Sequence, residues 1–476
     1  MVDLDEAEKS SGTGTEPPSG DDGDNKTSTD IHLSRDFINA LTDAVEDGDP
    51  AIVRGLVAPL HAADMADVLE VLSSRDRLEL IRLIGDELDA SVLYEVEGEA
   101  QDELYEHIPN AQIADAMTEL ETDQAVYVLE EMGEADRNEI LRSIAADDRL
   151  AIEDSLSHPE DSAGRLMQRN LIALPEFWTV GQTIDFLRNE TDTLPDTFYD
   201  IFIVDPAHHP RGTVPLSRIM RTRREETLGT LMDEDPHVLQ VSADQEEVAY
   251  QFAKYHLISA AVVDEAGRLV GVVTVDDVVD VIGEEAREDI LGLAGAGAEA
   301  TDGGVLEVTR SRFTWLVVNM ATAVAASMVI GAFEASIQQM VALAVLMPIV
   351  ASMGGNAGTQ TMALTVRAIA TKDLSAANAM RVFNRELVIS LLNGVSLAIL
   401  AGVLAHIWFG NPLLSWVFAA AMVVNVIVAG LSGLLVPVSL HKLGMDPALA
   451  STVFVTTITD VVGFFAFLGL AALVLF

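Results

Sequence analysis

Apolar residues recur at a regular interval through residues 31–160. Leu69, Leu93, Met117 and Leu141 fall 24 residues apart, and three further apolar positions of each unit repeat in the same step. Within a unit, apolar residues lie three and four positions apart, which places them on one face of a helix. Two short helices per unit, with each unit stacked on its neighbour, predict a small α-solenoid.

A different repeat follows, in which short apolar runs alternate with turn residues. The segment that begins at Ile203 matches the segment that begins at Val262, 59 residues later. Each copy has the order helix, strand, turn, strand, helix. The duplication predicts two α/β domains, residues 161–224 and 225–283, and it resembles a tandem pair of CBS domains.

The last third of the chain is apolar along nearly its whole length. Each of five apolar runs is long enough to cross a hydrocarbon core of about 30 Å. The predicted fold class is multidomain: a cytosolic α-solenoid and α/β tandem CBS domains, then an all-α five-helix transmembrane domain in residues 313–476. A connecting helix is expected at 284–312 and a disordered acidic tail at 1–30. The expected spans are 313–333, 339–370, 386–409, 413–440 and 449–475.

Charge is divided between the two parts as sharply as hydropathy. The chain has 75 acidic and 28 basic residues, a net charge of −47, and only five of each lie after residue 312. Nucleic acid is not an expected partner, because phosphate binding needs clustered lysine and arginine. The acid excess indicates a halophilic protein, since concentrated salt screens such self-repulsion. The chain has no cysteine, which excludes disulfides and thiolate metal sites.

Basic residues near the expected spans all fall on one side of the bilayer. The connections on the other side, residues 334–338 and 410–412, contain none. The positive-inside rule places the soluble domains in the cytoplasm, and an odd number of spans places the C-terminus outside. We therefore expect a multi-pass protein of the cell membrane, surrounded by the lipid bilayer. The basic residues are Arg310, Arg312, Arg367, Lys372, Arg381, Arg385 and Lys442.

The second expected span has a polar, glycine-rich middle that includes Gly355, Asn356 and Gln360. Irregular backbone cannot face lipid, so this stretch must face protein or water. A close-packed helix interface would explain the glycines, but it explains the two amide side chains less well. We favour a place in a pore or gate for this segment.

In the fifth expected span, Thr456, Thr459, Asp460 and Gly463 lie on one helix face. Asp460 is the only acid well inside an expected span, and a charge near the bilayer centre costs at least ~2.5–3.5 kcal/mol on insertion scales. No basic residue within the spans could pair with it. One alternative is a carboxyl that is hydrogen-bonded by threonine hydroxyls. We favour an ion pathway, because a cation would supply the missing counter-charge.

A third group of candidates lies at the end of the CBS pair. Acidic residues crowd the stretch 276–289, and several lie three and four positions apart, so they share a helix face and repel each other. Hard divalent cations bind clusters of carboxylate oxygens. The alternative is a solvated acidic face, since the whole soluble part is rich in acids. The stretch contains Asp276, Asp277, Asp280, Glu284, Glu285, Glu288 and Asp289.

Thr274 and Asp277 resemble the pattern that holds the ribose and phosphate of an adenine nucleotide in CBS domains. The matching positions of the first copy are Pro215 and Arg218, so only one cleft keeps the pattern. ATP is therefore a candidate ligand of that cleft. A plain strand-to-helix turn explains the two residues equally well.

The order of solenoid, CBS pair, acidic connector and five spans resembles the MgtE family of magnesium channels over residues 35–476. Two departures put one sensor site in doubt: His256 stands where the family usually has aspartate, and the first CBS copy breaks its pattern at Pro215. The motifs that carry the resemblance are Lys254-Tyr255 through Asp289, Gly354-Gly355-Asn356 to Asp373, Leu443-Gly444-Met445-Asp446-Pro447, and Thr459-Asp460-Val461-Val462-Gly463.

The resemblance implies a homodimer with a pore on its two-fold axis, through which hydrated Mg²⁺ enters the cell down its electrochemical gradient. Asp460 matches the pore aspartate, with Thr456, Thr459, Asn356 and Gly355 as its expected surroundings. Cytosolic Mg²⁺ would close the pore by binding acids of the solenoid, CBS pair and connecting helix; Asp115, Glu119 and Asp123 are solenoid acids that we could not align. The implied regulatory Mg²⁺ positions are Asp277, Asp280, Glu285, Glu288, Asp289, Glu246 and Asp446.

Two other classes of function stay open at this point. One is a transporter of another divalent cation, such as Co²⁺, on the same scaffold. The other is a membrane-anchored sensor in which the CBS pair binds a nucleotide and no ion flows. We do not expect an enzyme, because no nucleophile–base pairing or metal-ligand motif stands out.

Overall fold

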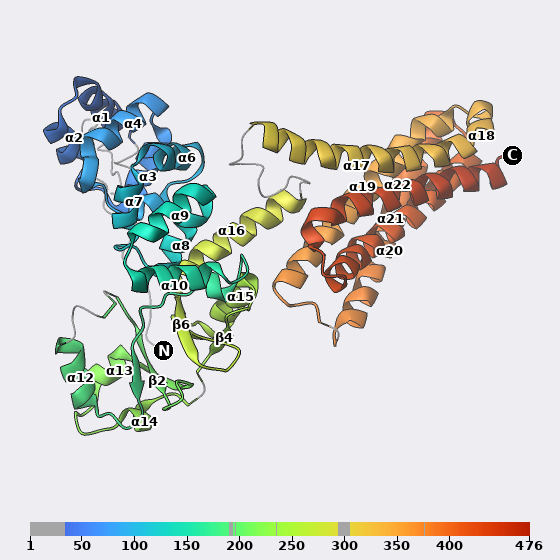
Figure 1. Ribbon diagram of the computed structural model, residues 1–476. Helices are drawn as coiled ribbons and strands as arrows, with labels where there is room; N and C mark the ends of the chain where they lie inside the picture. Colours follow the sequence, from blue (N-terminus) through green and yellow to red (C-terminus); the bar gives the residue numbers. More distant parts are fainter. Residues whose placement is uncertain (1–33, 190–193, 196, 235, 294–304, 376) are drawn as a thin grey trace, which may run out of the picture. The chain divides into compact units, whose positions relative to one another are not determined.

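The computed structural model describes residues 34–189, 194–195, 197–234, 236–293, 305–375 and 377–476. The expected acidic tail at 1–30 lies outside these residues, as does 294–304 of the expected connecting helix. The chain forms two compact units that are divided in sequence between Val96 and Glu97. Figure 1 shows short helices in the first third of the chain, two small α/β domains in the middle and long helices at the end.

The first unit consists of short helices that begin at polar caps. Ser34 Oγ accepts from the Phe37 N–H at 3.2 Å, and Asp49 Oδ1 accepts from the Ala51 N–H at 3.0 Å. Alternate helices pack on each other, α2 on α4 and α3 on α5. The elements are α1 (Arg35–Asp47), α2 (Pro50–Val57), α3 (Ala62–Val71), α4 (Ser74–Ile84), the 3₁₀ helix η1 (Gly85–Glu87) and α5 (Ser91–Glu95).

The second unit begins with five more helices of this kind, in which α7 packs on α9 and α8 on α10. The 24-residue unit therefore holds two helices, as expected, and each helix with its turn takes 12 residues: α3, α4, α7, α8, α9 and α10 begin at 62, 74, 110, 122, 134 and 146. The helices are α6 (Gly98–His107), α7 (Asn110–Ala116), α8 (Thr122–Glu131), α9 (Glu134–Ser143) and α10 (Ala146–Leu156).

The 12-residue period comes from an apolar residue that ends each helix and is buried. Two of the four sequence series described above are therefore one series with half the period. Arginine side chains satisfy the carbonyl groups that these helix ends expose: Arg137 donates to the carbonyls of Leu129 at 2.7 Å and Met132 at 3.1 Å. The buried end residues include Leu72, Ile84, Val96, Ile108, Met132 and Ile144.

Two three-stranded sheets follow, with the orders β1-β2-β3 and β4-β5-β6. In each sheet the first pair of strands is parallel and the second is antiparallel. The elements are α11 (Ala163–Leu166), β1 (Ala173–Pro175), α12 (Val180–Asn189), β2 (Asp200–Val204), β3 (Pro210–Pro215), α13 (Leu216–Arg221), α14 (Leu228–Leu231), β4 (Val238–Gln240), α15 (Gln245–Tyr255), β5 (Ser259–Val263) and β6 (Leu269–Thr274).

The two sheets exchange their leading segments. Ala163 and Met167 precede the first sheet but pack in the core of the second, beside Leu239 and Val248. Leu228 follows the first sheet and packs in the first core. The packing therefore crosses the domain boundary expected at 224/225, because each small sheet needs a segment from outside its own copy to cover it.

One long helix crosses the boundary expected at 283/284. The helix α16 (Val275–Leu293) starts directly after β6, so the last helix of the CBS pair and the start of the expected connecting helix are a single rigid element. Its buried residues Val278 and Val281 anchor it to the second CBS core. A change in that core is therefore carried along the helix toward its C-terminal end.

Five helices in the described residues are long and apolar enough to cross a membrane, as the hydropathy pattern predicts. They extend beyond several of the expected limits, because the helices continue into the polar ends of each run. α21 packs against α19, α20 and α22, whereas α17 packs mainly on α22. The elements are α17 (Val305–Ala332), α18 (Glu334–Gln339), α19 (Ala342–Ala370), α20 (Ala379–Phe409), α21 (Pro412–Lys442) and α22 (Pro447–Val474).

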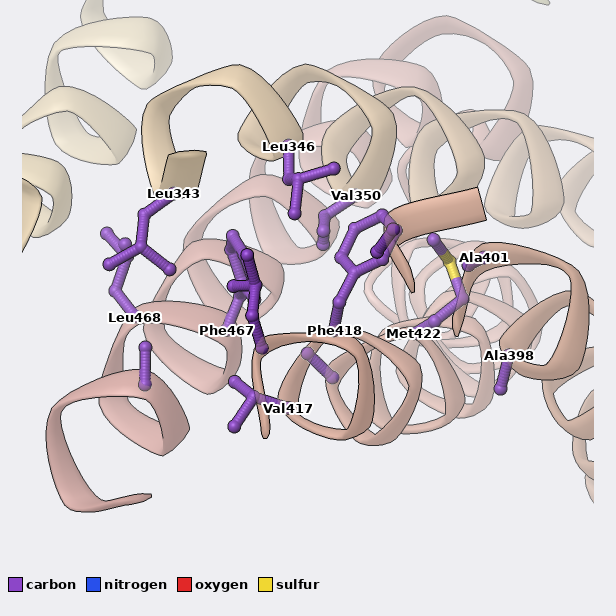
Figure 2. Packing of buried hydrophobic residues seen from close by; sticks show 14 of the residues in the cluster. Leu343, Leu346, Val350, Ala398, Ala401, Val417, Phe418, Met422, Phe467 and Leu468 are labelled. Carbon is purple, nitrogen blue, oxygen red and sulfur yellow. The ribbon is translucent and has the colours of Figure 1, made fainter. Parts of the chain in front are cut away.

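The bundle has an apolar core toward the end where α21 begins. Phe418 and Phe467 stack edge to face, with ring centroids 5.5 Å apart, and Figure 2 shows Leu346 and Val350 of α19 on the other side of Phe418. The same helices become polar farther along. The site described below begins where this core ends.

Candidate ion pathway and cation-binding acids

Asp460 lies on α22 and is half-buried. Within the described part of the chain, its carboxylate has no hydrogen-bond donor and no basic partner. The neighbouring hydroxyls are engaged with their own helix: Thr459 Oγ1 donates to the Thr456 carbonyl at 2.9 Å, and Thr456 Oγ1 donates to the Thr452 carbonyl at 2.8 Å. The alternative of a carboxyl held by threonine donors is therefore not what the structure contains.

The glycines of α19 bring that helix close to α22. A Cβ added at Gly358 would lie 2.6 Å from Val455 Cγ1 and 3.6 Å from Thr459 Cγ2. Close helix packing therefore explains this glycine. Because Gly358 faces Thr459, Asn356 of α19 and Asp460 of α22 lie within about one helical turn of the same level.

Gly355 and Asn356 are not used for packing. A Cβ added at Gly355 would meet nothing within 4 Å, and the exposed Asn356 side chain donates only to Ser352 Oγ, at 3.5 Å. The structure thus separates the glycines that pack α19 from the polar positions that we predicted to face an ion. The latter are open to a ligand.

A second carboxylate lies within the spans, which corrects the expectation that Asp460 is the only acid well inside one. α20 begins ahead of its expected span, so Glu386 lies about two turns inside the helix. Its Oε1 accepts hydrogen bonds from Thr361 Oγ1 at 2.8 Å and from Ser390 Oγ at 3.4 Å. Glu386 therefore has hydroxyl donors, whereas Asp460 has none.

In the soluble part, Asp277 and Asp123 lie at the first turns of α16 and α8. Asp277 Oδ2 accepts from Thr274 Oγ1 at 2.7 Å and from Gln168 Nε2 at 3.2 Å. Burial, with the charge of Asp276, raises the pKa of Asp277 to about 6. Burial and the neighbouring Asp277 raise the pKa of Asp123 well above its usual value, and Asp123 Oδ1 has no hydrogen-bond partner. Sequence reasoning named Asp123 only as an unaligned candidate.

A second group of acids surrounds the middle of α16. Glu285 Oε1 accepts from Gln245 Nε2 at 2.8 Å. Burial, with the charges of Glu246 and Glu288, raises the pKa of Glu285 to about 7. Burial, with the charge of Asp289 among others, also raises the pKa of Glu246. These carboxylates are therefore held near one another without enough counter-charge.

The group continues to the beginning of α22. Asp446 caps this helix by accepting from the Ala448 N–H at 2.7 Å. Burial and the Asp446 charge raise the pKa of Glu288 and of Asp289. One cavity of about 1740 Å³ is lined by Glu246, Glu285, Glu288, Asp289 and Asp446.

The predicted regulatory acids are brought together in part. Five of them share the cavity, and Asp277 pairs with Asp123, whereas Asp280 lies exposed on α16. In the segments that the structure describes, no three carboxylate or imidazole side chains form a ready-made metal site. His256 ends α15 with a left-handed backbone, φ 53°, and its N–H donates to the Phe252 carbonyl.

The expected nucleotide pattern is engaged with itself. Thr274 and Asp277 hydrogen-bond to each other, and Gln168 occupies a further acceptor position of the carboxylate. In the first copy, Arg218 donates to the Leu231 carbonyl at 2.6 Å and to Asp233 at 3.0 Å. The residues fit a turn as they stand, and a nucleotide would have to displace these contacts.

Three family models match the chain: a divalent cation transporter over residues 347–470, the MgtE intracellular N domain over 60–161, and a CBS domain over 228–284. The magnesium transporter MgtE of Thermus thermophilus is 32% identical over 442 residues, which cover 92% of this chain and 98% of that protein. The chain belongs to the MgtE family of magnesium transporters. MgtE of Bacillus subtilis is 29% identical over 90% of this chain and 95% of that protein.

Solved structures match the soluble part of this MgtE family member. The cytosolic domain of the Mg²⁺ channel MgtE in complex with ATP is 28% identical, with a TM-score of 0.48 over 51% of this chain and 99% of that chain. The soluble part of a magnesium transporter is 24% identical, with a TM-score of 0.47 over 53% of this chain and 98% of that chain. The curated relatives are transporters rather than enzymes.

Proposed function

We propose that this MgtE family member is a channel that admits hydrated Mg²⁺ into the cytoplasm down its electrochemical gradient. The observation that carries the proposal is the Asp460 carboxylate, which lies on a membrane-spanning helix without a donor or a basic partner among the described residues. An acid in this position is costly unless a cation or water meets it. A permeating divalent cation would supply the missing charge.

The surroundings of Asp460 suit an ion that keeps its water shell. Mg²⁺ dehydrates reluctantly, and its bound waters present hydrogen-bond donors. The hydroxyls of Thr456 and Thr459 already donate to helix carbonyls, so their free lone pairs can accept from such waters. Gly355 and the open Asn356 side chain add a carbonyl and an amide at a similar level. In a homodimer, each subunit would contribute one Asp460.

The membrane potential would drive entry without ATP hydrolysis. Two charges that move inward release about 4.6 kcal/mol per 100 mV. The basic residues at one end of the spans support cytoplasmic solenoid and CBS domains and an external C-terminus. Arg367 ends α19 and Arg381 begins α20, so their connection belongs to the cytoplasmic face.

Cytosolic Mg²⁺ would close the pore by neutralising the acids along α16. The Asp123 and Asp277 carboxylates repel in a buried position, as do Glu285, Glu288 and Asp289 in the cavity. A divalent cation converts this repulsion into attraction. Because α16 is one helix from the second CBS core to Leu293, the change at the acids would be transmitted along it. ATP at the CBS cleft would require the Thr274–Asp277 bond to open.

The test is Mg²⁺ flux into proteoliposomes in concentrated KCl, with wild type, Asp460→Asn and the control Glu334→Gln, an acid of the short helix α18. We expect Asp460→Asn to lose flux and Glu334→Gln to keep it, with Mg²⁺ on the cytoplasmic side suppressing wild-type flux. Preferential Co²⁺ flux that competes at Asp460 would favour another divalent cation. No flux from folded wild type, together with nucleotide binding, would favour the anchored sensor.

A further inference from the structure

α21 carries an amide in the middle of the bundle that the ion pathway described above does not include. Asn425 is fully buried, with 0% exposure. Its Nδ2 donates to the carbonyl of Val350 in α19 at 2.7 Å. Its Oδ1 is buried and has no hydrogen-bond partner within the described segments. Val350 itself belongs to the apolar core, beside Phe418 (Figure 2).

Two glycines receive the Asn425 side chain, one from each of the helices that carry the proposed ion site. A Cβ added at Gly354 of α19 would collide with Asn425 Nδ2, and one added at Gly463 of α22 would lie 2.8 Å from Oδ1. Gly463 follows Asp460 by about one helical turn and lies on the same face. The amide therefore touches α19 and α22 at once, from the helix that packs against both.

Stability alone does not explain an asparagine here. The amide makes one hydrogen bond and leaves the oxygen without a donor, and a buried polar atom without a partner is costly. A leucine of similar volume would leave no polar atom unsatisfied and would pack in the apolar core. Departures of this kind from the most stable choice are expected at functional positions.

We propose that Asn425 is a positioning residue of the ion pathway: its amide pins the α19 backbone at Val350 and seats against Gly463, and so sets the level of Asp460 relative to the polar segment of α19. The proposal rests on the proposed function for the role of Asp460. It adds the contact that holds the two helices in register. Hydroxyl contacts cannot do this, since the threonines of α22 bond within their own helix.

The first experiment compares Asn425→Leu with Ser432→Ala, a buried polar residue of α21 whose hydroxyl donates only to the Ala429 carbonyl of its own helix, at 3.0 Å. For Asn425→Leu we expect unchanged thermal stability and a half-saturating Mg²⁺ concentration that rises about tenfold, since misplacing a positioned group by about 1 Å costs up to 10²-fold. Ser432→Ala should match wild type. A purely structural role predicts lower stability with an unchanged half-saturating concentration, and that result would overturn the proposal.

A double-mutant cycle tests the contact with α22. Gly463→Ala should disturb Mg²⁺ flux in the wild-type background, because its methyl group meets Asn425 Oδ1, and should have little further effect in Asn425→Ala, where the space is free. Additive effects of the two substitutions would show that the glycine acts without Asn425 and would contradict the proposal.

A third readout does not depend on which ion moves. The chain has no cysteine, so spin labels can be placed at exposed Leu364→Cys of α19 and Phe454→Cys of α22. We expect Asn425→Leu to shift or broaden the distance distribution between the labels, and Ser432→Ala to leave it unchanged. An identical distribution in Asn425→Leu refutes the positioning role. Absence of wild-type Mg²⁺ flux would instead refute the proposed function, and the label distances alone would then decide.

Discussion

Replacing Asp123 by asparagine is expected to stabilise the contact between α8 and α16 when Mg²⁺ is absent. At neutral pH, wild-type Asp123 must either ionise in a buried position beside Asp277 or take up a proton against its ordinary pKa. Asparagine has nearly the same shape, carries no charge and can donate to the Asp277 carboxylate. The substitution removes the repulsion and keeps the contact.

The magnitude follows from the pKa of Asp277, which burial raises from 3.8 to about 6. At about 1.4 kcal/mol per pKa unit, ionising this group in place costs roughly 3 kcal/mol. Burial remains in the Asp123→Asn protein, so we expect only part of this, about 1–2 kcal/mol, to be recovered. For a soluble part of this size, this corresponds to a rise in Tm of about 2–8 °C.

The pH dependence has a definite sign. A carboxyl whose pKa is raised by folding destabilises the folded state only once it ionises in the unfolded chain. The penalty is therefore absent below about pH 4 and complete above the folded value, about 6 for Asp277. Wild type should lose stability between pH 5 and pH 8 without Mg²⁺, and Asp123→Asn should lose less.

Scanning calorimetry of the full-length protein in detergent and concentrated KCl, with and without Mg²⁺, measures both effects. Asp276→Asn is the matched control, because it removes the same charge from an exposed position one residue from Asp277. We expect Mg²⁺ to raise the Tm of wild type and Asp276→Asn more than that of Asp123→Asn. An Asp123→Asn protein that is less stable than wild type, with an undiminished response to Mg²⁺, would refute the reasoning.

Three further substitutions have clear expected outcomes. Asp460→Asn should lower Mg²⁺ flux in proteoliposomes by at least about tenfold, because the charge that attracts the cation is lost; wild-type flux would contradict this. Arg137→Ala should cost about 1–3 kcal/mol in urea unfolding, because helix-end carbonyls lose a charged donor. Gly433→Ala should cost about 1–3 kcal/mol in thermal unfolding, since its Cβ would lie 2.5 Å from the Gly358 carbonyl oxygen. Gly355→Ala, which meets open space, should leave the Tm unchanged.

Properties that depend on neighbours along the chain could be predicted from the sequence. Helical faces, β-turns and apolar runs long enough to span a bilayer are all local, so the solenoid, the CBS pair and the five helices were predicted correctly. The α22 face that carries Asp460 is of the same kind. The period of the solenoid was identified as a multiple, because adjacent 12-residue helices differ enough in polar residues to make pairs of helices look more alike.

Contacts between distant segments could not be predicted in this way. Asn425 stands alone in an apolar run, and its only signal in the sequence is that it is an amide where leucine would do. That it meets Gly354 and Gly463 follows from how three helices pack. Glu386 was placed at the edge of a span, because nothing in its neighbours shows that Thr361 donates to it.

By itself, the sequence determined the order of domains, the acidic surface and the number of spans, since hydropathy and charge are sums over neighbouring residues. Only the tertiary structure decided which acids face each other. Asp123 is one acid among many in a crowded solenoid, and its pairing with Asp277 depends on how α8 meets α16. Desolvation acts through space rather than along the chain, so the raised pKa values, and with them the candidate Mg²⁺ contacts, emerge only when the helices are packed.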